Sequence, residues 1–223
     1  MPGVPTVSVV ICTLNEAPNL PHVLPRIPEG IEEILLVDGR SADGTVDVAR
    51  KLRPEVRVLY EDGKGKGLAL RRGIEAATGD IVVTLDADGE TDPADLPLFV
   101  DALRNGCDFA KGSRFAAGSK NPRGRPPWDW LMVTTFNRLF RANFTDLCSG
   151  YNGFWRAITQ RIDLWSPTGW NYEPLFVIRA VKAGLRVQEV PHRSLPRLSG
   201  RSKLGVWRQT FITMRILAGE RFG

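Results

Sequence analysis

The sequence predicts an α/β protein whose mostly parallel central sheet is flanked by helices. Short runs of β-branched and aliphatic residues alternate with segments of helical spacing as far as Lys111, which is typical of a sheet covered by helices on both faces. Polar or acidic residues follow these runs where each strand is expected to end. With 223 residues and 43% hydrophobic content, the chain can bury its own core. In such sheets, ligands bind beyond the carboxyl ends of the strands.

The first two expected strands lead into polar turns. Val7–Cys12 precedes the turn 13–16, and Ile31–Val37 precedes Asp38. A helix follows the second turn, with Asp43 as its expected N-cap. Both turns are therefore expected at the ligand-binding edge of the sheet.

A glycine-rich segment follows the third expected strand, Val56–Tyr60. It reads Gly63-Lys64-Gly65-Lys66-Gly67 and opens the helix 68–77. Its spacing matches neither a Walker loop nor a dinucleotide fingerprint. Glycines allow backbone to approach a phosphate closely, and Lys66 adds a positive charge, so a phosphate-binding loop is one interpretation. A flexible turn before a helix is the other, and both remain open.

The central expected strand, Ile81–Leu85, leads directly into Asp86-Ala87-Asp88. In extended backbone, the side chains of residues i and i+2 point the same way, so both carboxylates can converge on one hard cation. This arrangement suits a divalent ion that also binds the oxygens of a diphosphate. The alternative is a solvated acidic turn that ends the strand.

The second half of the chain is less regular than the first. The loop 112–130 is basic, and it is either a mobile lid or a plain connector. The next helix carries the aromatic residues Trp128, Trp130, Phe136 and Phe140. Aromatic residues at these spacings are expected in the core, and contact with a lipid is the alternative. The expected elements are, in order, a helix capped by Asp92-Pro93 that ends near Arg104, a strand at 107–111, a helix at 128–142, a strand after the turn 146–150, a helix at 172–183, a strand at 185–190 and a helix at 204–222.

The C-terminal segment 204–223 is expected to be an amphipathic helix appended to a domain that spans residues 1–203. Leu204, Trp207, Phe211, Met214 and Leu217 recur at steps of three and four, with arginines between them. Such a helix can lie in the plane of a membrane surface or pack on the core of its own domain. Both interpretations remain open.

The charge and composition restrict the class of partner and the compartment. The formal net charge is +5, with the excess gathered in the last third, which suits phosphate-bearing ligands or an anionic membrane surface. No nucleic-acid partner is expected. The three cysteines show no metal-binding or disulfide spacing, and no segment reaches about 18 uninterrupted apolar residues. We therefore expect a cytoplasmic protein without a transmembrane segment, in possible contact with the inner face of the cell membrane.

Several motifs occur together in register along the chain. They are Thr13-x-Asn15-Glu16, Val37-Asp38-x-x-Ser41-x-Asp43-Gly44-Thr45, Gly65-Lys66-Gly67, Gly79-Asp80 and Asp86-x-Asp88. Together they resemble the inverting family 2 glycosyltransferases of the GT-A fold. Three later stretches are similar to the dolichol- and polyprenyl-phosphate mannose synthases: Gly112-Ser113-Arg114, Asp146-x-x-Ser149-Gly150 and Arg197-x-x-Gly200-x-Ser202-Lys203-Leu204.

The resemblance implies a donor site and an acceptor site. The donor is a GDP- or UDP-hexose and the acceptor a polyprenyl phosphate, with Mg²⁺ or Mn²⁺ on the donor diphosphate. The implied nucleotide-binding residues are Thr13, Glu16, Asp38, Lys66 and Asp86; the metal ligands are Asp86 and Asp88; and the acceptor-binding residues are Arg114, Ser149, Arg197 and Ser202.

The expected reaction moves mannose or glucose to the acceptor, with Asp88, Arg114 and Asp146 as the catalytic residues. A phosphomonoester needs a cationic environment rather than a general base, because its second pKa is about 6. A hydroxyl or thiol acceptor is the alternative, and it needs a base such as Asp146 or Glu173. A sugar-nucleotide pyrophosphorylase and a non-catalytic binding module are further alternatives. Whether His192 is a third metal ligand stays open.

Overall fold

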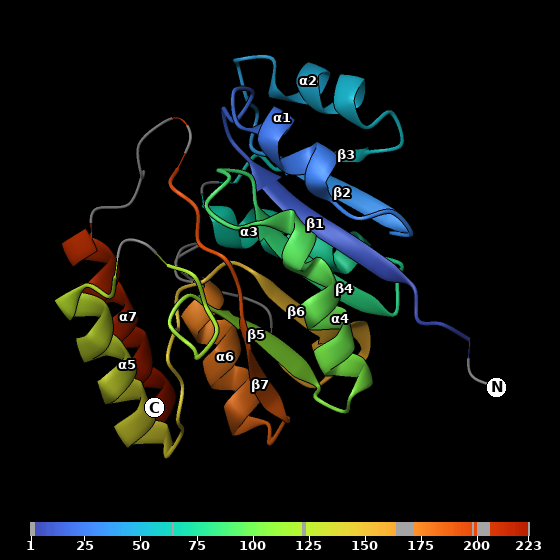
Figure 1. Ribbon diagram of the computed structural model, residues 1–223. Coiled ribbons are helices and arrows are strands. Elements are labelled where there is room, and N and C mark those ends of the chain that lie inside the picture. The colour runs from blue at the N-terminus through green and yellow to red at the C-terminus, as the bar shows by residue number, and fades with distance from the viewer. Residues whose placement is uncertain are drawn as a thin grey trace.

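The computed structural model describes residues 3–63, 65–121, 124–163, 172–197, 199 and 206–222. Within these residues, seven strands form one sheet in the order β3-β2-β1-β4-β6-β5-β7 (Figure 1). The strands are β1 (Val7–Thr13), β2 (Glu33–Asp38), β3 (Arg57–Tyr60), β4 (Ile81–Asp86), β5 (Phe109–Ser113), β6 (Asn152–Trp155) and β7 (Val187–Pro191). The α/β class with a mostly parallel sheet is confirmed.

Strand β6 runs against all the others. It pairs antiparallel with β4, where Thr84 lies opposite Asn152, and antiparallel with β5, where Lys111 lies opposite the same residue. The remaining pairs are parallel. The amino end of β6 therefore lies at the edge where β1, β2, β4 and β5 have their carboxyl ends. The sequence did not predict this reversal, because the composition of a short buried strand does not encode its direction.

Helices cover both faces of the sheet (Figure 1). Side chains alternate across it, so Val9 and Ile11 pack into one core cluster and Val10 into the other. The first cluster lies under α1 (Leu20–Val23), α2 (Thr45–Leu52) and α4 (Leu96–Arg104), and the second under α3 (Lys66–Ala76), α5 (Pro127–Phe140), α6 (Tyr172–Lys182) and α7 (Val206–Phe222). Short 3₁₀ helices span Leu24–Arg26, Pro93–Asp95 and Arg156–Gln160.

Two of the expected helix starts use the acidic residues that the sequence indicated. Asp92 is an N-cap, since its Oδ1 accepts a hydrogen bond from the Ala94 amide at 3.1 Å. At α2, the N-cap residue is Gly44, with φ +82°. Asp43, the expected N-cap, is therefore the residue before the N-cap, and its Oδ1 accepts a hydrogen bond from the Thr45 amide at 3.0 Å.

Helices α5 and α7 lie side by side at the end of the sheet (Figure 1). Phe136 is buried, but Trp130 is 58% exposed, so the expectation that Trp130 joins the core is wrong. The expected apolar stripe of α7 is divided, because Leu217 is buried and Phe211 is 63% exposed. Among the residues described, no helix is long and apolar enough to cross a bilayer.

Candidate active site

Asp38 joins the turns that follow β1 and β2. Its Oδ1 accepts hydrogen bonds from Thr13 Oγ1 at 2.9 Å and from Ser41 Oγ at 2.6 Å, and its Oδ2 accepts from the Ser41 amide at 2.8 Å. The side chain is almost completely buried. Two of the expected nucleotide-binding residues, Thr13 and Asp38, are thus in direct contact.

Further hydrogen bonds hold these two turns together. Asn15 adopts a left-handed conformation with φ +55°; its amide donates to Ser41 Oγ at 2.8 Å, and its Oδ1 accepts from the Ala42 amide at 2.9 Å. The Glu16 carboxylate accepts from Asn19 Nδ2 at 2.6 Å. The Glu16 amide donates to Thr45 Oγ1 at 2.9 Å, so the turn after β1 is also bonded to the start of α2.

Lys66 lies between two carboxylates at the start of α3. Its Nζ is 2.5 Å from Asp86 Oδ1 and 2.5 Å from Glu173 Oε1. Burial alone would lower the pKa of Lys66, but the negative charges of Asp86 and Glu173 outweigh burial and raise it. Lys66 therefore stays protonated and neutralises Asp86.

The backbone at Gly150 packs directly on this ion pair. A Cβ atom at Gly150 would lie 2.3 Å from Asp86 Oδ2 and 2.8 Å from Lys66 Nζ, so a side chain there would displace this ion pair or the turn. The turn that precedes β6 thus forms part of the surface around Asp86. This contact links the expected donor and acceptor sites.

Asp88 is paired with an arginine. Arg197 Nη2 contacts Asp88 Oδ2, and Arg197 Nε lies 3.5 Å from Glu90 Oε1. Burial, together with the nearby charge of Asp86, raises the pKa of Asp88 to about 6. Asp86 and Asp88 are therefore close enough to interact, and each is balanced by its own cation.

The oxygen donors of Asp86, Asp88 and Glu90 suit a hard divalent cation such as Mg²⁺ or Mn²⁺. In the described part of the chain, no three acidic, histidine or cysteine side chains are already assembled as a metal site. Glu90 was missed in the sequence, although it continues the alternation Asp86-x-Asp88-x-Glu90. That alternation was the signal available.

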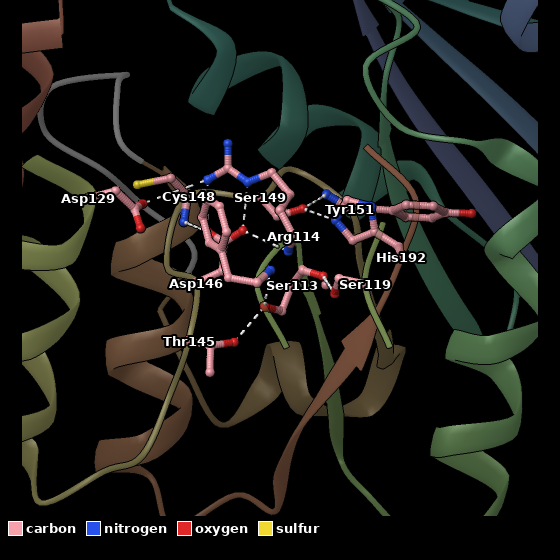
Figure 2. A network of polar contacts seen from close by, with 12 residues as sticks. Ser113, Arg114, Ser119, Asp129, Thr145, Asp146, Cys148, Ser149, Tyr151 and His192 are labelled. Atoms are coloured by element: carbon pink, nitrogen blue, oxygen red, sulfur yellow. Dashed lines mark hydrogen bonds and ion pairs between the residues drawn. The ribbon is translucent and has the colours of Figure 1, made fainter. Parts of the chain in front are cut away.

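Arg114 forms a bidentate pair with Asp146 (Figure 2). Nε and Nη2 of Arg114 donate to the two carboxylate oxygens at 2.6 and 2.9 Å, and the Arg114 amide donates at 3.0 Å. Asp146 is completely buried. Burial would raise its pKa, but the charge and hydrogen bonds of Arg114 outweigh burial and hold it below the usual range. Asp146 is thus a stable anion whose oxygens are already engaged.

Glu189, on β7, orients the segment that carries Asp146. Its Oε1 accepts hydrogen bonds from the amides of Thr145 and Asp146 at 2.8 and 2.9 Å, and its Oε2 accepts from Thr145 Oγ1 at 2.9 Å. Sequence reasoning missed Glu189, and no local motif indicates this role, because the contact joins residues far apart in the chain.

Ser149 is held from two sides (Figure 2). Its Oγ lies 2.9 Å from His192 Nε2, while its carbonyl accepts from Lys111 Nζ at 3.0 Å. The other ring nitrogen of His192, Nδ1, lies 3.1 Å from the Arg193 carbonyl. Both nitrogens of His192 are therefore engaged within the protein, which disfavours His192 as a metal ligand. Burial lowers the pKa values of Lys111 and His192.

The structure gathers most of the expected site residues at one edge of the sheet. Residue Ser202 lies outside the described residues, as do Gly200, Lys203 and Leu204 of the same motif. The expected residues that the structure places are Thr13, Glu16, Asp38, Lys66, Asp86, Asp88, Arg114, Asp146, Ser149 and Arg197.

Sequence comparison identifies relatives along nearly the whole chain. The sequence model of glycosyl transferase family 2 matches residues 8–163. Undecaprenyl-phosphate mannosyltransferase of Micrococcus luteus is 33% identical over 214 residues, which cover 89% of this chain and 87% of that protein. Polyprenol monophosphomannose synthase of Mycolicibacterium smegmatis is 32% identical over 218 residues, which cover 88% of this chain and 80% of that protein.

Structural comparison identifies the same fold. The crystal structure of glucosyl-3-phosphoglycerate synthase from Mycobacterium tuberculosis, in complex with Mn²⁺, uridine diphosphate and glucosyl-3-phosphoglycerate, has a TM-score of 0.79 at 22% identity. The match covers 97% of this chain and 80% of that chain. The fold and the site define a glycosyltransferase of the GT-A fold. The chain belongs to glycosyl transferase family 2, which disagrees with the pyrophosphorylase alternative.

Proposed function

We propose that this chain is a metal-dependent, inverting glycosyltransferase that moves mannose or glucose from a GDP- or UDP-sugar to a polyprenyl phosphate. The observation that carries the proposal is the pair of Arg114 and Asp146. The acidic residue nearest the expected acceptor site is fully engaged in holding an arginine. The site therefore offers a positioned cation rather than a general base, which is what a phosphate acceptor needs.

The donor half of the site handles the leaving diphosphate. Asp86 and Asp88, with Glu90, would hold Mg²⁺ or Mn²⁺, and the ion would neutralise the charge that develops on the leaving group. The crystal structure with Mn²⁺ and uridine diphosphate, which has the same fold, supports the use of a divalent ion. Thr13, Glu16, Asp38 and Lys66 would bind the nucleotide.

The acceptor half of the site contains two arginines, Arg114 and Arg197. A phosphomonoester with a second pKa of about 6 is largely ionised at neutral pH, so it can act as the nucleophile without losing a proton. Arg114 and Arg197 would bind its oxygens, and Ser149 and Ser202 would add hydroxyl donors. Asp146 then acts by orienting Arg114, and Glu189 acts by orienting Asp146.

The acceptor lipid requires a route to the membrane, and helices α5 and α7 supply an exposed apolar surface. Trp130 and Leu131 on α5 are 58% and 49% exposed, and Phe211 on α7 is 63% exposed. Arg138 lies on the exposed stripe of α5, and Arg215 on that of α7. Such a surface favours peripheral binding to the anionic cytoplasmic leaflet, where each arginine contributes about 1 kcal/mol.

A transfer assay tests this function. Purified protein is incubated with GDP- and UDP-hexoses, undecaprenyl phosphate and Mn²⁺ or Mg²⁺, and the glycolipid is detected by mass spectrometry. We expect transfer from one donor to the lipid phosphate, with no product after EDTA treatment or in Asp88→Asn. Transfer to undecaprenol or a free sugar, abolished by Glu173→Gln, would instead support the hydroxyl-acceptor alternative, since Glu173 remains its candidate base.

A further inference from the structure

Arg197 contacts two carboxylates of the expected metal site at the same time. Its Nη2 pairs with Asp88, and its Nε lies 3.5 Å from Glu90 Oε1. We propose that Arg197 is an internal counter-ion that competes with the divalent cation for Asp88 and Glu90, and that it must leave them before the cation binds. The inference rests on the proposed function in one respect, namely that a divalent cation binds these carboxylates.

The segment before Arg197 is attached to the loop that carries Glu90. The Leu195 amide donates to the Glu90 carbonyl at 2.8 Å, and Ser194 forms a β-bridge with Thr91. These bonds hold the guanidinium within reach of Asp88 and Glu90, which gives it a high effective concentration there. Because Arg197 lies two residues beyond the Leu195 bond, its side chain can move while this attachment remains.

The arginine and a divalent cation need the same atoms. A guanidinium pairs with carboxylate oxygens through its N–H groups, and Mg²⁺ or Mn²⁺ binds those oxygens directly. The side chains of Asp88, Glu90 and Arg197 are only 13%, 31% and 26% exposed, so water screens the attraction between them incompletely. The two cations therefore exclude each other at Asp88 Oδ2.

Lys66, the second internal cation of the site, has a different set of partners. It contacts Asp86 and also Glu173, at 2.5 Å each, and Glu173 is not one of the expected metal ligands. Lys66 keeps a partner when Asp86 turns to a metal ion. Of the two carboxylates that Arg197 contacts, Asp88 is an expected metal ligand and Glu90 an additional candidate, so loss of both contacts would leave its guanidinium available for an anion.

Because Arg197, unlike Lys66, has no carboxylate partner outside the candidate metal site among the described residues, its release would link donor binding to acceptor binding. The guanidinium of Arg197 would be available to the acceptor phosphate only when Asp88 and Glu90 bind the divalent cation that accompanies the donor diphosphate. The donor is therefore expected to bind before the acceptor. By linkage, a variant whose residue 197 does not pair with these carboxylates must bind the metal ion more tightly in the absence of donor and acceptor.

The test measures Mn²⁺ binding alone, without nucleotide or acceptor. Free Mn²⁺ is followed by electron paramagnetic resonance during titration of the wild type, Arg197→Gln and Arg197→Lys. We expect Arg197→Gln to bind Mn²⁺ about tenfold more tightly than the wild type, on the scale of a charge-assisted hydrogen bond. Arg197→Lys should lie between the two, because it keeps the charge without the planar fork.

Arg193→Gln is the matched control. It removes one positive charge from the same segment, but Arg193 pairs with Asp92 and Asp95 rather than with the metal carboxylates, so its Mn²⁺ affinity should stay close to that of the wild type. Equal or weaker binding by Arg197→Gln would overturn the proposal, as would an equal gain in Arg193→Gln. Tight binding that survives Asp88→Asn in the Arg197→Gln background would also overturn it, because the ion would then bind elsewhere.

The outcome is separable from that of the proposed function. Mn²⁺ affinity is read without any sugar transfer, so a wrong acceptor leaves this measurement unaffected. Conversely, the wild type could transfer the sugar to undecaprenyl phosphate while Arg197→Gln shows unchanged Mn²⁺ affinity. That result would support the proposed function and reject the competition alone.

Discussion

Nε2 of His192 lies 2.9 Å from Oγ of Ser149, and both side chains are almost completely buried. Burial lowers the pKa of His192, so the folded protein binds fewer protons there than the unfolded chain does. The free energy of unfolding must therefore decrease as the pH falls through about 6.5, the ordinary histidine value. We expect the melting temperature of the wild type to drop more between pH 7.5 and 5.5 than that of His192→Gln.

The glutamine variant is a suitable comparison, because its amide oxygen can still accept from Ser149 but cannot take up a proton. Asp88, with a pKa raised to about 6, contributes the opposite slope in this range, but it does so equally in both proteins. Scanning calorimetry at several pH values, without metal, measures the difference. Parallel pH profiles of the two proteins would show that His192 does not resist protonation.

A second prediction concerns the pair of Arg114 and Asp146. In Asp146→Asn the arginine loses its close partner and keeps the longer ion pair with Asp129, at 3.8 Å, while most of its surface stays buried. We therefore expect a destabilisation of about 2–4 kcal/mol. Chemical denaturation provides the measurement. The double variant Arg114→Gln/Asp146→Asn should recover part of the lost stability, since it leaves no unpaired charge. A double variant no more stable than Asp146→Asn would contradict this explanation.

A third prediction concerns Gly150. Its missing Cβ would lie 2.3 Å from Asp86 Oδ2, so Gly150→Ala must displace either the carboxylate or the turn. We expect at least about tenfold weaker nucleoside-diphosphate binding in the presence of Mn²⁺, or about 1.4 kcal/mol, by calorimetry. Gly219→Ala on α7 is the control, since nothing lies within 4 Å of its added Cβ. Unchanged nucleotide binding by Gly150→Ala would remove Asp86 from the expected site.

A fourth prediction concerns the exposed apolar surface of α5 and α7 that we propose binds the membrane. Replacing Trp130 and Phe211 by serine removes two exposed aromatic side chains without opening the core. The double variant should sediment less with anionic liposomes than the wild type, and wild-type binding should weaken at high salt. Leu98→Ser is the control, because Leu98 is 47% exposed on α4, which covers the other face of the sheet. Equal losses in both variants would argue against a specific surface.

The first half of the fold could be predicted from sequence because its signals are local. The strands β1, β2 and β4 are apolar runs that end in polar turns, and the helices between them show regular spacing. The direction of β6 could not be predicted, since it depends on pairing with β4 and β5. The exposure of Trp130 could not be predicted either, because it depends on which neighbouring elements cover each face of α5. The spacing of a helix reveals a stripe, but it does not reveal what covers it.

The candidate site divides in the same way. Thr13, Asp38 and Asp86 are the last residues of strands that lie next to each other, so sheet topology alone predicts that they meet. The supports of the acceptor half come from distant segments. Glu189 contacts residues more than 40 positions away in sequence, and no pattern in a single sequence reveals such a contact.

The reversed strand β6 has a consequence for how this architecture can diversify. The chain leaves the ligand-binding edge at the end of β5 and returns to it at the start of β6, so residues 114–151 form an excursion that begins and ends at one place. Insertions or exchanges within this excursion leave the register of every strand pair unchanged. The turns after β1 and β2, where we propose that the nucleotide binds, lie entirely outside it. Apart from Gly150, which packs on Asp86 and Lys66, this excursion could therefore change in evolution while the strand ends that carry Thr13, Asp38 and Asp86 stay as they are.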